Sequence, residues 1–283
     1  MSLRGKTLFI TGASRGIGYA IGLRAAHEGA NIAIAAKTVK EHPKLKGTIY
    51  SAAADFEAAG GRALALEVDV RDEVAVRAAI QATADRFGGI DIVVNNASAI
   101  SRTSVEETDI KRFDLMQQVN SRGTFLVSKL AIPHLRKTEN PHVLTLAPPL
   151  NLLPHWVKGH VAYTLSKYGM SLCTLGMAAE FADAGIAFNA LWPRFGISTS
   201  AIEFAVANAD ELRRCRKPQI MADAACAIIK RPARTCTGNF FIDDSLLYAE
   251  GVRDFSQYRV DCTTQLRPGM FIPDADTPPP GAV

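Results

Sequence analysis

A tyrosine and a lysine, Tyr163 and Lys167, are the two residues of this sequence whose types and spacing best suit proton chemistry. They fall in an expected helix over residues 162–181, where side chains four positions apart lie on one face. The phenol of a free tyrosine has a pKa of about 10, and a neighbouring ammonium group stabilises the charged phenolate. The pair is a candidate general acid/base, although an isolated pair of this kind would be a structural tyrosine beside an exposed lysine.

A glycine-rich turn near the start of the chain can cradle a phosphate group. Gly12, Gly16 and Gly18 follow an expected strand over 7–10 and open an expected helix over 16–28. Glycine permits a tight turn, close approach of the backbone to a pyrophosphate and close packing of helix against strand. The unpaired N–H groups at the helix N-terminus attract the anion. This order of strand, turn and helix predicts a dinucleotide site.

The end of the second expected strand bears on which dinucleotide binds. A site specific for NAD(H) has an acidic residue about twenty positions after the glycines, where it binds the ribose hydroxyl. This sequence has Lys37 there and no carboxylate, and Arg15 lies inside the glycine turn. Both can neutralise a 2′-phosphate, so we expect NADP(H) to be preferred, with NAD(H) as the alternative. The later lysines, Lys40, Lys44 and Lys46, also fit a solvated loop.

Strand-like and helix-like segments alternate along the chain. Short apolar runs predict strands over residues 7–10, 31–36, 63–68, 91–94, 142–146, 186–191 and 239–242. Helical patterns fill the gaps over residues 16–28, 49–59, 73–87, 110–135, 162–181 and 221–230. This alternation is typical of βαβ units, so the predicted fold class is α/β, a Rossmann-type doubly wound parallel sheet of about seven strands with helices on both faces. Such a sheet binds its ligand beyond the carboxyl ends of the strands, where the glycine turn falls.

The composition argues against several other classes of protein. The 283 residues include 32 Lys and Arg and 28 Asp and Glu, a net charge of +4 that does not argue for nucleic acid as a partner. No apolar run reaches the roughly 18 residues of a membrane span, and the N-terminus lacks a signal core. The five cysteines include no Cys-x-x-Cys pair, and the six histidines form no recognised metal motif. We therefore expect a cytoplasmic protein without a metal site.

The glycine turn, two asparagine motifs and the tyrosine–lysine pair together resemble the motifs of the short-chain dehydrogenase/reductase family. The motifs are residues 11–18, Asn95-Asn96-Ala97, Asn120 within residues 119–123, and Tyr163 with Lys167. The resemblance implies a single domain over residues 1–244, with a substrate-covering helical segment near 195–217, and a C-terminal extension over 245–283. It also implies a homodimer or homotetramer, because the family consists of dimers and tetramers.

Further segments resemble the hydroxysteroid dehydrogenase-like branch of this family, without the sterol-carrier module of that branch. They are residues 34–38, 95–100, 148–152 and 189–193.

The resemblance implies roles for individual residues. Tyr163 would exchange a proton with the substrate oxygen, Lys167 would hold the nicotinamide ribose and lower the tyrosine pKa, and Asn120 would keep a water that links Lys167 to solvent. Asp69 would contact the adenine, and Asn96 would line the ribose side. The implied cofactor-binding residues are Gly12, Ser14, Arg15, Gly16, Ile17, Gly18, Lys37, Asp69, Val70, Asn96, Ala97, Tyr163, Lys167, Pro193, Ile197 and Thr199.

Two positions depart from the family pattern. Arg194 replaces the usual glycine after Pro193, and Ala147 or Pro148 occupies the place of the serine that normally binds the reacting oxygen. Neither replacement for the serine has a side chain that donates a hydrogen bond, and the loss of one such donor typically lowers the rate by about 10²–10³. The nearby polar side chains that can substitute are Ser98, Thr145 and Asn151, of which Asn151 is favoured because its amide both donates and accepts.

These observations predict an NADP(H)-dependent oxidoreductase that interconverts a secondary alcohol and a ketone. The expected small-molecule substrate is apolar, with lipid- or steroid-like compounds among the candidates. The missing serine supports an alternative of another class, a nucleotide-binding sensor or scaffold with weak or no catalysis.

Three other features have less specific interpretations. The basic run over residues 213–217 is interpreted as a solvated helix end rather than a site for an anionic tail such as coenzyme A. Asp243 and Asp244 close the last expected strand without visible partners for a metal. The extension over 245–283 can cover the pocket or form a subunit contact, and the sequence does not choose between them.

Overall fold

A seven-stranded sheet in the order β3-β2-β1-β4-β5-β6-β7 forms the centre of the computed structural model, which describes residues 1–42, 45–200 and 209–283. Every neighbouring pair of strands is parallel. The order reverses between β1 and β4, so the two halves of the sheet wind in opposite directions from that point. The strands are β1 (Thr7–Thr11), β2 (Asn31–Ala36), β3 (Arg62–Glu67), β4 (Ile92–Asn95), β5 (His142–Thr145), β6 (Ala187–Trp192) and β7 (Phe240–Ile242).

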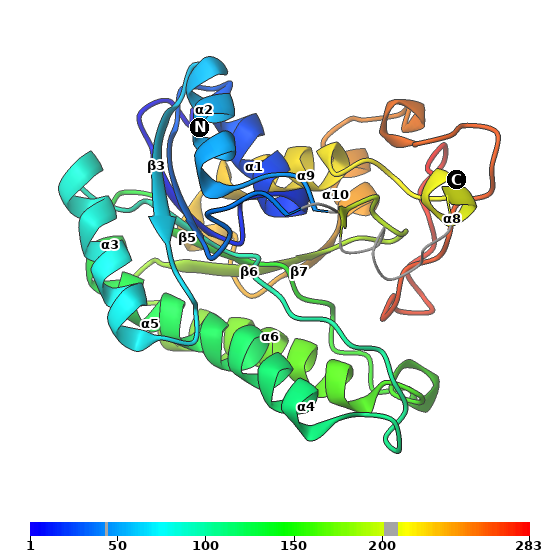
Figure 1. Ribbon diagram of the computed structural model, residues 1–283. Coiled ribbons are helices and arrows are strands. Elements are labelled where there is room, and N and C mark those ends of the chain that lie inside the picture. The colour runs from blue at the N-terminus through cyan, green and yellow to red at the C-terminus, as the bar shows by residue number, and fades with distance from the viewer. Residues whose placement is uncertain (43–44, 201–208) are drawn as a thin grey trace.

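Helices cover both faces of the sheet (Figure 1). One face packs against α1 (Gly16–Ala26), α2 (Ile49–Ala58), α9 (Gln219–Ile229) and α10 (Asp243–Ala249). The other face packs against α3 (Glu73–Phe87), α5 (Gly123–Leu135) and α6 (Val161–Glu180), with α4 (Ile110–Met116) at the end of that layer. The predicted fold class is confirmed.

Local chemistry explains why the elements begin and end where they do. Strands β1 and β2 are buried along their whole length, which is why they read as continuous apolar runs. The Asp72 side chain accepts hydrogen bonds from two backbone N–H groups at the start of α3, and Gly88 ends that helix at a φ of +87°. The predicted strand limits therefore fall within one residue of the observed ones at each end, and those of α3 are the same.

The helix predicted over residues 110–135 is not a regular α-helix. A π-helical turn, η1 (Gln117–Arg122), separates α4 from α5. Within it the Asn120 amide bonds to the backbone of Ala99 and to the side chain of Ser166, so the turn is fixed by contacts outside the helix. Apolar periodicity does not reveal such a turn, because its partners are distant in sequence.

The C-terminal residues pack closely onto the sheet domain. Helix α10 spans the predicted domain boundary at residue 244, and Phe255, Tyr258 and Ala282 belong to the same apolar core as α1 and α9. Short elements that the sequence analysis did not predict are α8 (Ala209–Arg213), α10, η2 (Pro154–Trp156), η3 (Ala233–Thr235) and η4 (Ser256–Tyr258). In the part of the chain that the structure describes, no helix has both the length and the apolar character to cross a membrane.

Candidate active site

Two cavities with a partly shared lining form one cleft beyond the carboxyl ends of the strands, next to the reversal between β1 and β4. The glycine-loop cavity has a volume of about 450 Å³, and the tyrosine cavity, which contains Tyr163 and Lys167, has a volume of about 290 Å³. The residues that line both cavities are Ile17, Asn96, Ser98, Ile100 and Thr199.

The structure brings nearly all of the predicted site residues to this cleft. Besides the shared residues, the glycine-loop cavity is lined by the predicted Gly12, Ser14, Arg15, Gly16, Lys37, Asp69, Val70 and Ala97. The tyrosine cavity adds Tyr163, Lys167, Pro193 and Ile197. Of the predicted residues, Gly18 and Asn120 line neither cavity, because each supports a segment behind the lining.

The glycine turn leaves no room for larger side chains. Gly12 and Gly16 adopt φ values of +69° and +64°, which favour glycine. A Cβ atom on Gly12 would lie 3.0 Å from the Ala97 backbone, and one on Gly18 would lie 2.4 Å from the Asn96 side-chain nitrogen. The glycines therefore allow close contact between the start of α1 and the end of β4.

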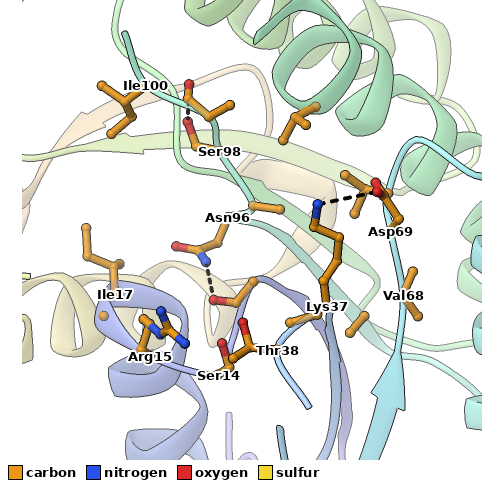
Figure 2. Close-up of a pocket in the computed structure, with 18 of the residues that line it drawn as sticks. Ser14, Arg15, Ile17, Lys37, Thr38, Val68, Asp69, Asn96, Ser98 and Ile100 are labelled. Atoms are coloured by element: carbon orange, nitrogen blue, oxygen red, sulfur yellow. Dashed lines mark hydrogen bonds and ion pairs between the residues drawn. The ribbon is translucent and has the colours of Figure 1, made fainter. Parts of the chain in front are cut away.

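Hydrogen bonds join the glycine turn to the segment after β4. The Asn96 side-chain nitrogen donates to the carbonyl oxygens of Thr11 and Gly12 at 2.9 and 3.1 Å. The Thr11 hydroxyl in turn accepts from the backbone N–H groups of Asn96 and Ala97, both at 3.0 Å. The Asn96 amide thus fixes the shape of the turn, and the same residue lines the cavity (Figure 2).

Two basic side chains, Arg15 and Lys37, line the glycine-loop cavity, and Figure 2 shows the Lys37 ammonium directed at Asp69. The Arg15 Nη2 donates to the Gly47 carbonyl at 2.8 Å, while its buried Nε has no partner among the described residues. The Lys37 ammonium lies 3.5 Å from the Asp69 carboxylate, which Arg71 also holds at 2.6 Å. The hydrogen bonds from Arg71, and the charge of Lys37, keep the pKa of Asp69 far below its usual range. Arg71 was not predicted, and no motif marks it.

Tyr163 and Lys167 occupy the first turns of α6, as predicted, and both are buried. The Lys167 ammonium donates to the Leu146 carbonyl at 2.6 Å and lies 5.2 Å from the centre of the Trp192 ring. Burial lowers the pKa of Lys167 to about 7. Burial also raises the pKa of Tyr163 to about 12, and the charge of Arg102 opposes this shift. In the structure, burial therefore raises the pKa of Tyr163 more than neighbouring positive charge lowers it.

Asn120 lies behind the wall of the tyrosine cavity. Its carbonyl oxygen accepts from the Ala99 N–H at 2.8 Å, and its nitrogen donates to the Ala99 carbonyl and the Ser166 hydroxyl, both at 2.9 Å. These three bonds fix the backbone segment that carries Ser98 and Ile100 into the cavity. The predicted contact of Asn120 with a water stays a prediction.

The three polar side chains considered as replacements for the missing serine have different surroundings. Thr145 is buried in β5 and lines neither cavity. The favoured Asn151 also lines neither cavity, since its nitrogen donates to the Ile272 carbonyl at 3.3 Å and its oxygen accepts from the Leu153 N–H at 3.2 Å. Ser98 alone of the three lines the tyrosine cavity.

The C-terminal segment forms one wall of the tyrosine cavity. Residues 267–270 line it directly, and the Trp192 indole donates to the Met270 carbonyl at 2.7 Å. Phe271 then packs between the aromatic rings of Trp156, Tyr163, Tyr168 and Trp192, with ring centres 5.3 to 6.4 Å apart. Of the two roles left open for the extension, the structure places it at the pocket.

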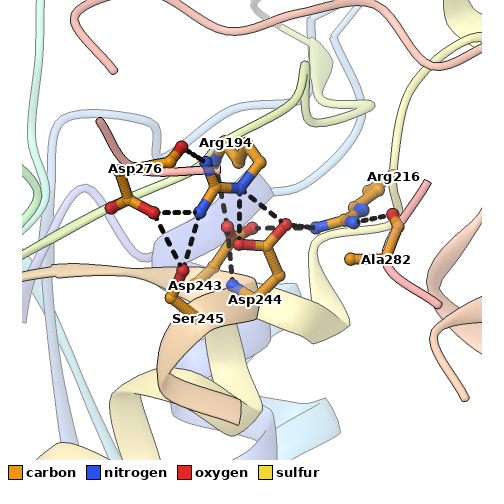
Figure 3. A network of polar contacts seen from close by, with 7 residues as sticks. All are labelled: Arg194, Arg216, Asp243, Asp244, Ser245, Asp276 and Ala282. Atoms are coloured by element: carbon orange, nitrogen blue, oxygen red, sulfur yellow. Dashed lines mark hydrogen bonds and ion pairs between the residues drawn. The ribbon is translucent and has the colours of Figure 1, made fainter. Parts of the chain in front are cut away.

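A buried ionic network holds this segment to the domain (Figure 3). Asp244 lies between two guanidinium groups and accepts from Arg194 at 2.7 Å and from Arg216 at 3.1 Å. Arg194 also binds the Asp276 carboxylate at 2.6 Å, and Arg216 donates to the Ala282 carbonyl. The residue that replaces the family's glycine therefore anchors the extension.

The network corrects the interpretation of residues 213–217 as a solvated helix end. Arg216 is completely buried, because Asp244 and the C-terminal backbone supply its partners. Its neighbours Arg213 and Arg214 form ion pairs with Asp261 and Glu211. Part of the predicted substrate-covering segment, residues 201–208, lies outside the described residues.

Comparison with known proteins identifies the family of this chain. The family model for short chain dehydrogenases matches residues 6–206. The chain therefore belongs to the short-chain dehydrogenase/reductase family, a family of oxidoreductases that use NAD(P)(H).

Within that family, the chain is 56% identical to hydroxysteroid dehydrogenase-like protein 2 of Danio rerio, over 95% of this chain and 64% of the relative. It is also 56% identical to the Rattus norvegicus protein of the same name, over 96% of this chain and 52% of the relative. The predicted branch is confirmed, and the chain spans between half and two-thirds of these relatives. A crystal structure of a protein from Xanthomonas campestris described as a dehydrogenase superimposes with a TM-score of 0.94, at 56% identity, over 97% of this chain and all of the other.

Proposed function

We propose that this chain is an NADP(H)-dependent oxidoreductase that interconverts a secondary alcohol and a ketone. The observation that carries the proposal is the position of Tyr163 and Lys167 in a cavity continuous with the glycine-loop cavity. A group bound along the glycine turn can extend directly to the tyrosine, so hydride and proton transfer can occur at one place.

The lining of the glycine-loop cavity fits a dinucleotide. Gly12 and Gly16 keep the turn open to a pyrophosphate, and the neighbouring start of α1 offers backbone N–H groups. In this proposal Asp69 and Val70, which line the glycine-loop cavity, contact the adenine, and Ala97, Ile197 and Thr199 lie along the cofactor towards Tyr163. When bound, the nicotinamide supplies or accepts the hydride.

Three basic or polar side chains support a preference for NADP(H). Arg15, Lys37 and Thr38 line the glycine-loop cavity, and β2 ends at Ala36 without a carboxylate. The unpartnered Nε of Arg15 is a hydrogen-bond donor suited to a phosphate oxygen. The exposed Lys37 ammonium lies 3.5 Å from the Asp69 carboxylate, so in this proposal it exchanges or shares that contact when it binds a 2′-phosphate.

Tyr163 acts in this proposal as the general acid of ketone reduction. A phenol whose pKa is about 12 is protonated at neutral pH, so it can donate its proton to the carbonyl oxygen. Lys167 lies one turn further along α6, where its amine can bind a ribose hydroxyl and, when charged, stabilise the phenolate left after donation. The reverse reaction uses the phenolate as the base.

Ser98 is the side chain that we propose in place of the missing serine. It lines the tyrosine cavity, whereas Ala147 and Pro148 offer no side-chain donor. The rest of the lining includes Leu146, Trp192, Phe195 and Met221, so a predominantly apolar substrate fits best.

The exposed apolar side chains of α5 and α6 support a homodimer or homotetramer. Phe125, Leu165, Leu172 and Leu175 are about half exposed on these two neighbouring helices. A second copy of the chain covering them would remove this apolar surface from water. Light scattering of the purified protein at several concentrations tests the expected dimer or tetramer against a monomer.

A panel of aliphatic, cyclic and aromatic ketones, offered with NADPH, tests the proposed activity. Turnover of at least one ketone, followed by the loss of reduced nicotinamide and by product analysis, supports the oxidoreductase. Tight binding of NADPH without turnover of any ketone or alcohol would favour the second candidate, a nucleotide-binding sensor or scaffold. The observation behind that candidate is the absence of a donor at Ala147 and Pro148.

A further inference from the structure

Every charged residue that lines the tyrosine cavity is basic. The three are Arg102, Lys167 and Arg267, and no aspartate or glutamate belongs to the described lining. The remaining walls are largely apolar. A cavity of this kind favours a ligand that combines an apolar body with a negative charge.

Only one of the three basic groups is available for such a charge. The Lys167 ammonium donates to the Leu146 carbonyl, and the Arg267 guanidinium lies 3.4 Å from the Glu211 carboxylate. Arg102 has no carboxylate partner among the described residues. Its one contact there is with the Met270 sulfur at 3.5 Å, and a thioether is only a weak acceptor.

Several described arginines, such as Arg62, Arg112 and Arg136, also have no ion pair, and what distinguishes Arg102 from them is that it lines the tyrosine cavity. Arg71, Arg194 and Arg213 each pair with an aspartate. Arg102 is instead an exposed residue of the cavity lining without a carboxylate partner among the described residues, and its backbone segment is fixed three residues earlier, where Asn120 binds both backbone groups of Ala99. The guanidinium is therefore carried on an anchored segment rather than on a free loop.

The charge of Arg102 acts on the reacting side of the cavity. Arg102 and Tyr163 line the same cavity, and the charge of Arg102 opposes the rise that burial causes in the pKa of Tyr163. An anion bound by Arg102 would share this cavity with a carbonyl group placed at the tyrosine hydroxyl.

We propose that Arg102 binds the carboxylate of the substrate, and that the substrate is an apolar hydroxy- or oxo-carboxylic acid. This inference rests on the proposed function, since it names the class of ketone that the same cavity takes. A guanidinium recognises a carboxylate through two parallel hydrogen bonds, and the apolar walls then cover the hydrocarbon chain. The paired or buried arginines at 213, 214 and 216 offer no comparable site for a larger phosphate-bearing tail.

Binding of non-reacting probes tests the proposal without turnover. Decanoate and decanamide share their chain and differ in charge, and isothermal titration calorimetry in saturating NADP⁺ measures the affinity of each. The wild-type protein is expected to bind decanoate about tenfold or more tightly than decanamide, the effect of one charge-assisted hydrogen-bonded pair. Arg102→Gln is expected to abolish the difference, and Arg102→Lys to retain part of it.

Arg112→Gln is the matched control, because it removes the same charge from an exposed position of α4 that lines neither cavity. It is expected to leave the preference for decanoate intact. Equal loss in Arg102→Gln and Arg112→Gln, or no preference for decanoate in the wild-type protein, would overturn the proposal.

Kinetics with 4-oxodecanoate and its methyl ester separate this inference from the proposed function. Reduction of either ketone takes one hydride from NADPH and one proton. A preference in kcat/KM for the acid that falls about tenfold in Arg102→Gln supports the inference. Reduction of acid and ester at equal kcat/KM, unaffected by Arg102→Gln, overturns the inference and leaves the oxidoreductase standing. If decanoate binding depends on Arg102 but neither ketone nor any other is reduced, the proposed function fails and the carboxylate site stands.

Discussion

The two ends of the cleft are built in different ways. The glycine-loop cavity is formed mainly by short segments that follow directly after β1, β2, β3 and β4, and its shape depends on glycines and on hydrogen bonds between those segments. The tyrosine cavity combines the start of α6 with residues 192–197 and with the C-terminal residues 267–270, which a buried ionic network holds in place. The glycine-loop end follows from where the parallel strands end in the sheet, whereas the tyrosine end also needs C-terminal residues that lie outside the sheet.

Because the two ends are built differently, we expect substitutions at each end to affect the binding of a different ligand. Changes in the glycine turn alter the backbone at the reversal of the sheet, so they affect any dinucleotide. Changes in the C-terminal wall alter only the cavity around Tyr163. The comparison therefore predicts that substitutions at one end leave the binding at the other end largely unchanged.

Tyr163→Phe is expected to have the largest effect on activity and to leave binding in the glycine-loop cavity unchanged. Removal of the hydroxyl takes away the proton donor, so kcat/KM for ketone reduction should fall by about 10³. The Kd for NADPH, measured by fluorescence titration, should stay within about twofold of the wild-type value, because the ring and its packing remain.

Tyr168→Phe is the control for that variant, since it removes a hydroxyl from the next residue of α6 that donates to the Asn151 backbone outside both cavities. It should change kcat/KM little. Equal rates for Tyr163→Phe and the wild-type protein would show that another group transfers the proton.

Asp244→Asn is expected to destabilise the C-terminal wall. Removing this carboxylate leaves the positive charges of the buried Arg194 and Arg216 without their shared negative partner. The free energy of unfolding in urea should therefore fall by about 3 kcal/mol. The neighbouring Asp243 is a matched comparison. Burial and the charge of Asp244 raise the pKa of Asp243 to about 7, so it is partly protonated at neutral pH.

Asp243→Asn should therefore cost about 1 kcal/mol or less, because an amide oxygen can still accept the backbone N–H groups of Arg194 and Asp244. Equal losses for the two variants would mean that the charge of Asp244 is not what holds the wall.

The buried Lys167 makes stability depend on pH in the ligand-free protein. Its pKa is about 7 in the folded chain and 10.5 when the side chain is fully solvated, as in the unfolded chain. Between these two pH values the amine is protonated in the unfolded chain and largely neutral in the folded one. The free energy of unfolding of the wild-type protein should therefore rise with pH relative to that of Lys167→Met, by about 2 kcal/mol from pH 7 to 9. Lys129→Met, which changes an exposed lysine, should show no such dependence. A flat difference for Lys167→Met would show that the amine is not held in a low-dielectric site.

Lys37→Ala is expected to have the smallest effect, and at the opposite end of the cleft. Loss of one exposed charge beside a 2′-phosphate should weaken NADPH binding about five- to tenfold and leave NADH binding unchanged. Lys40→Ala removes a lysine that does not line the cavity and should change neither. Tighter binding of NADH than of NADPH, with a ratio unaffected by Lys37→Ala, would contradict the preference for NADP(H).

The glycine-loop end of the cleft could be predicted from the sequence, and the tyrosine end only in part. The glycine turn and the Tyr163–Lys167 spacing imply their own geometry, because backbone conformation and helix periodicity act over a few residues. Arg216 was interpreted as solvated because its partner Asp244 lies 28 residues away. Asn151 was favoured as a donor although the tail uses its amide. The solvation and hydrogen bonding of such side chains depend on contacts with residues distant in sequence, which a local sequence pattern cannot reveal.

Transfer of an isotopic label is the measurement that tests the central claim most directly. NADPH carrying deuterium at both positions of nicotinamide C4 is incubated with the wild-type protein and the ketone panel, and the alcohols formed are analysed by mass spectrometry and NMR. The account predicts that deuterium appears on the carbinol carbon of at least one product. Tight binding of the labelled NADPH without any deuterated alcohol would contradict it.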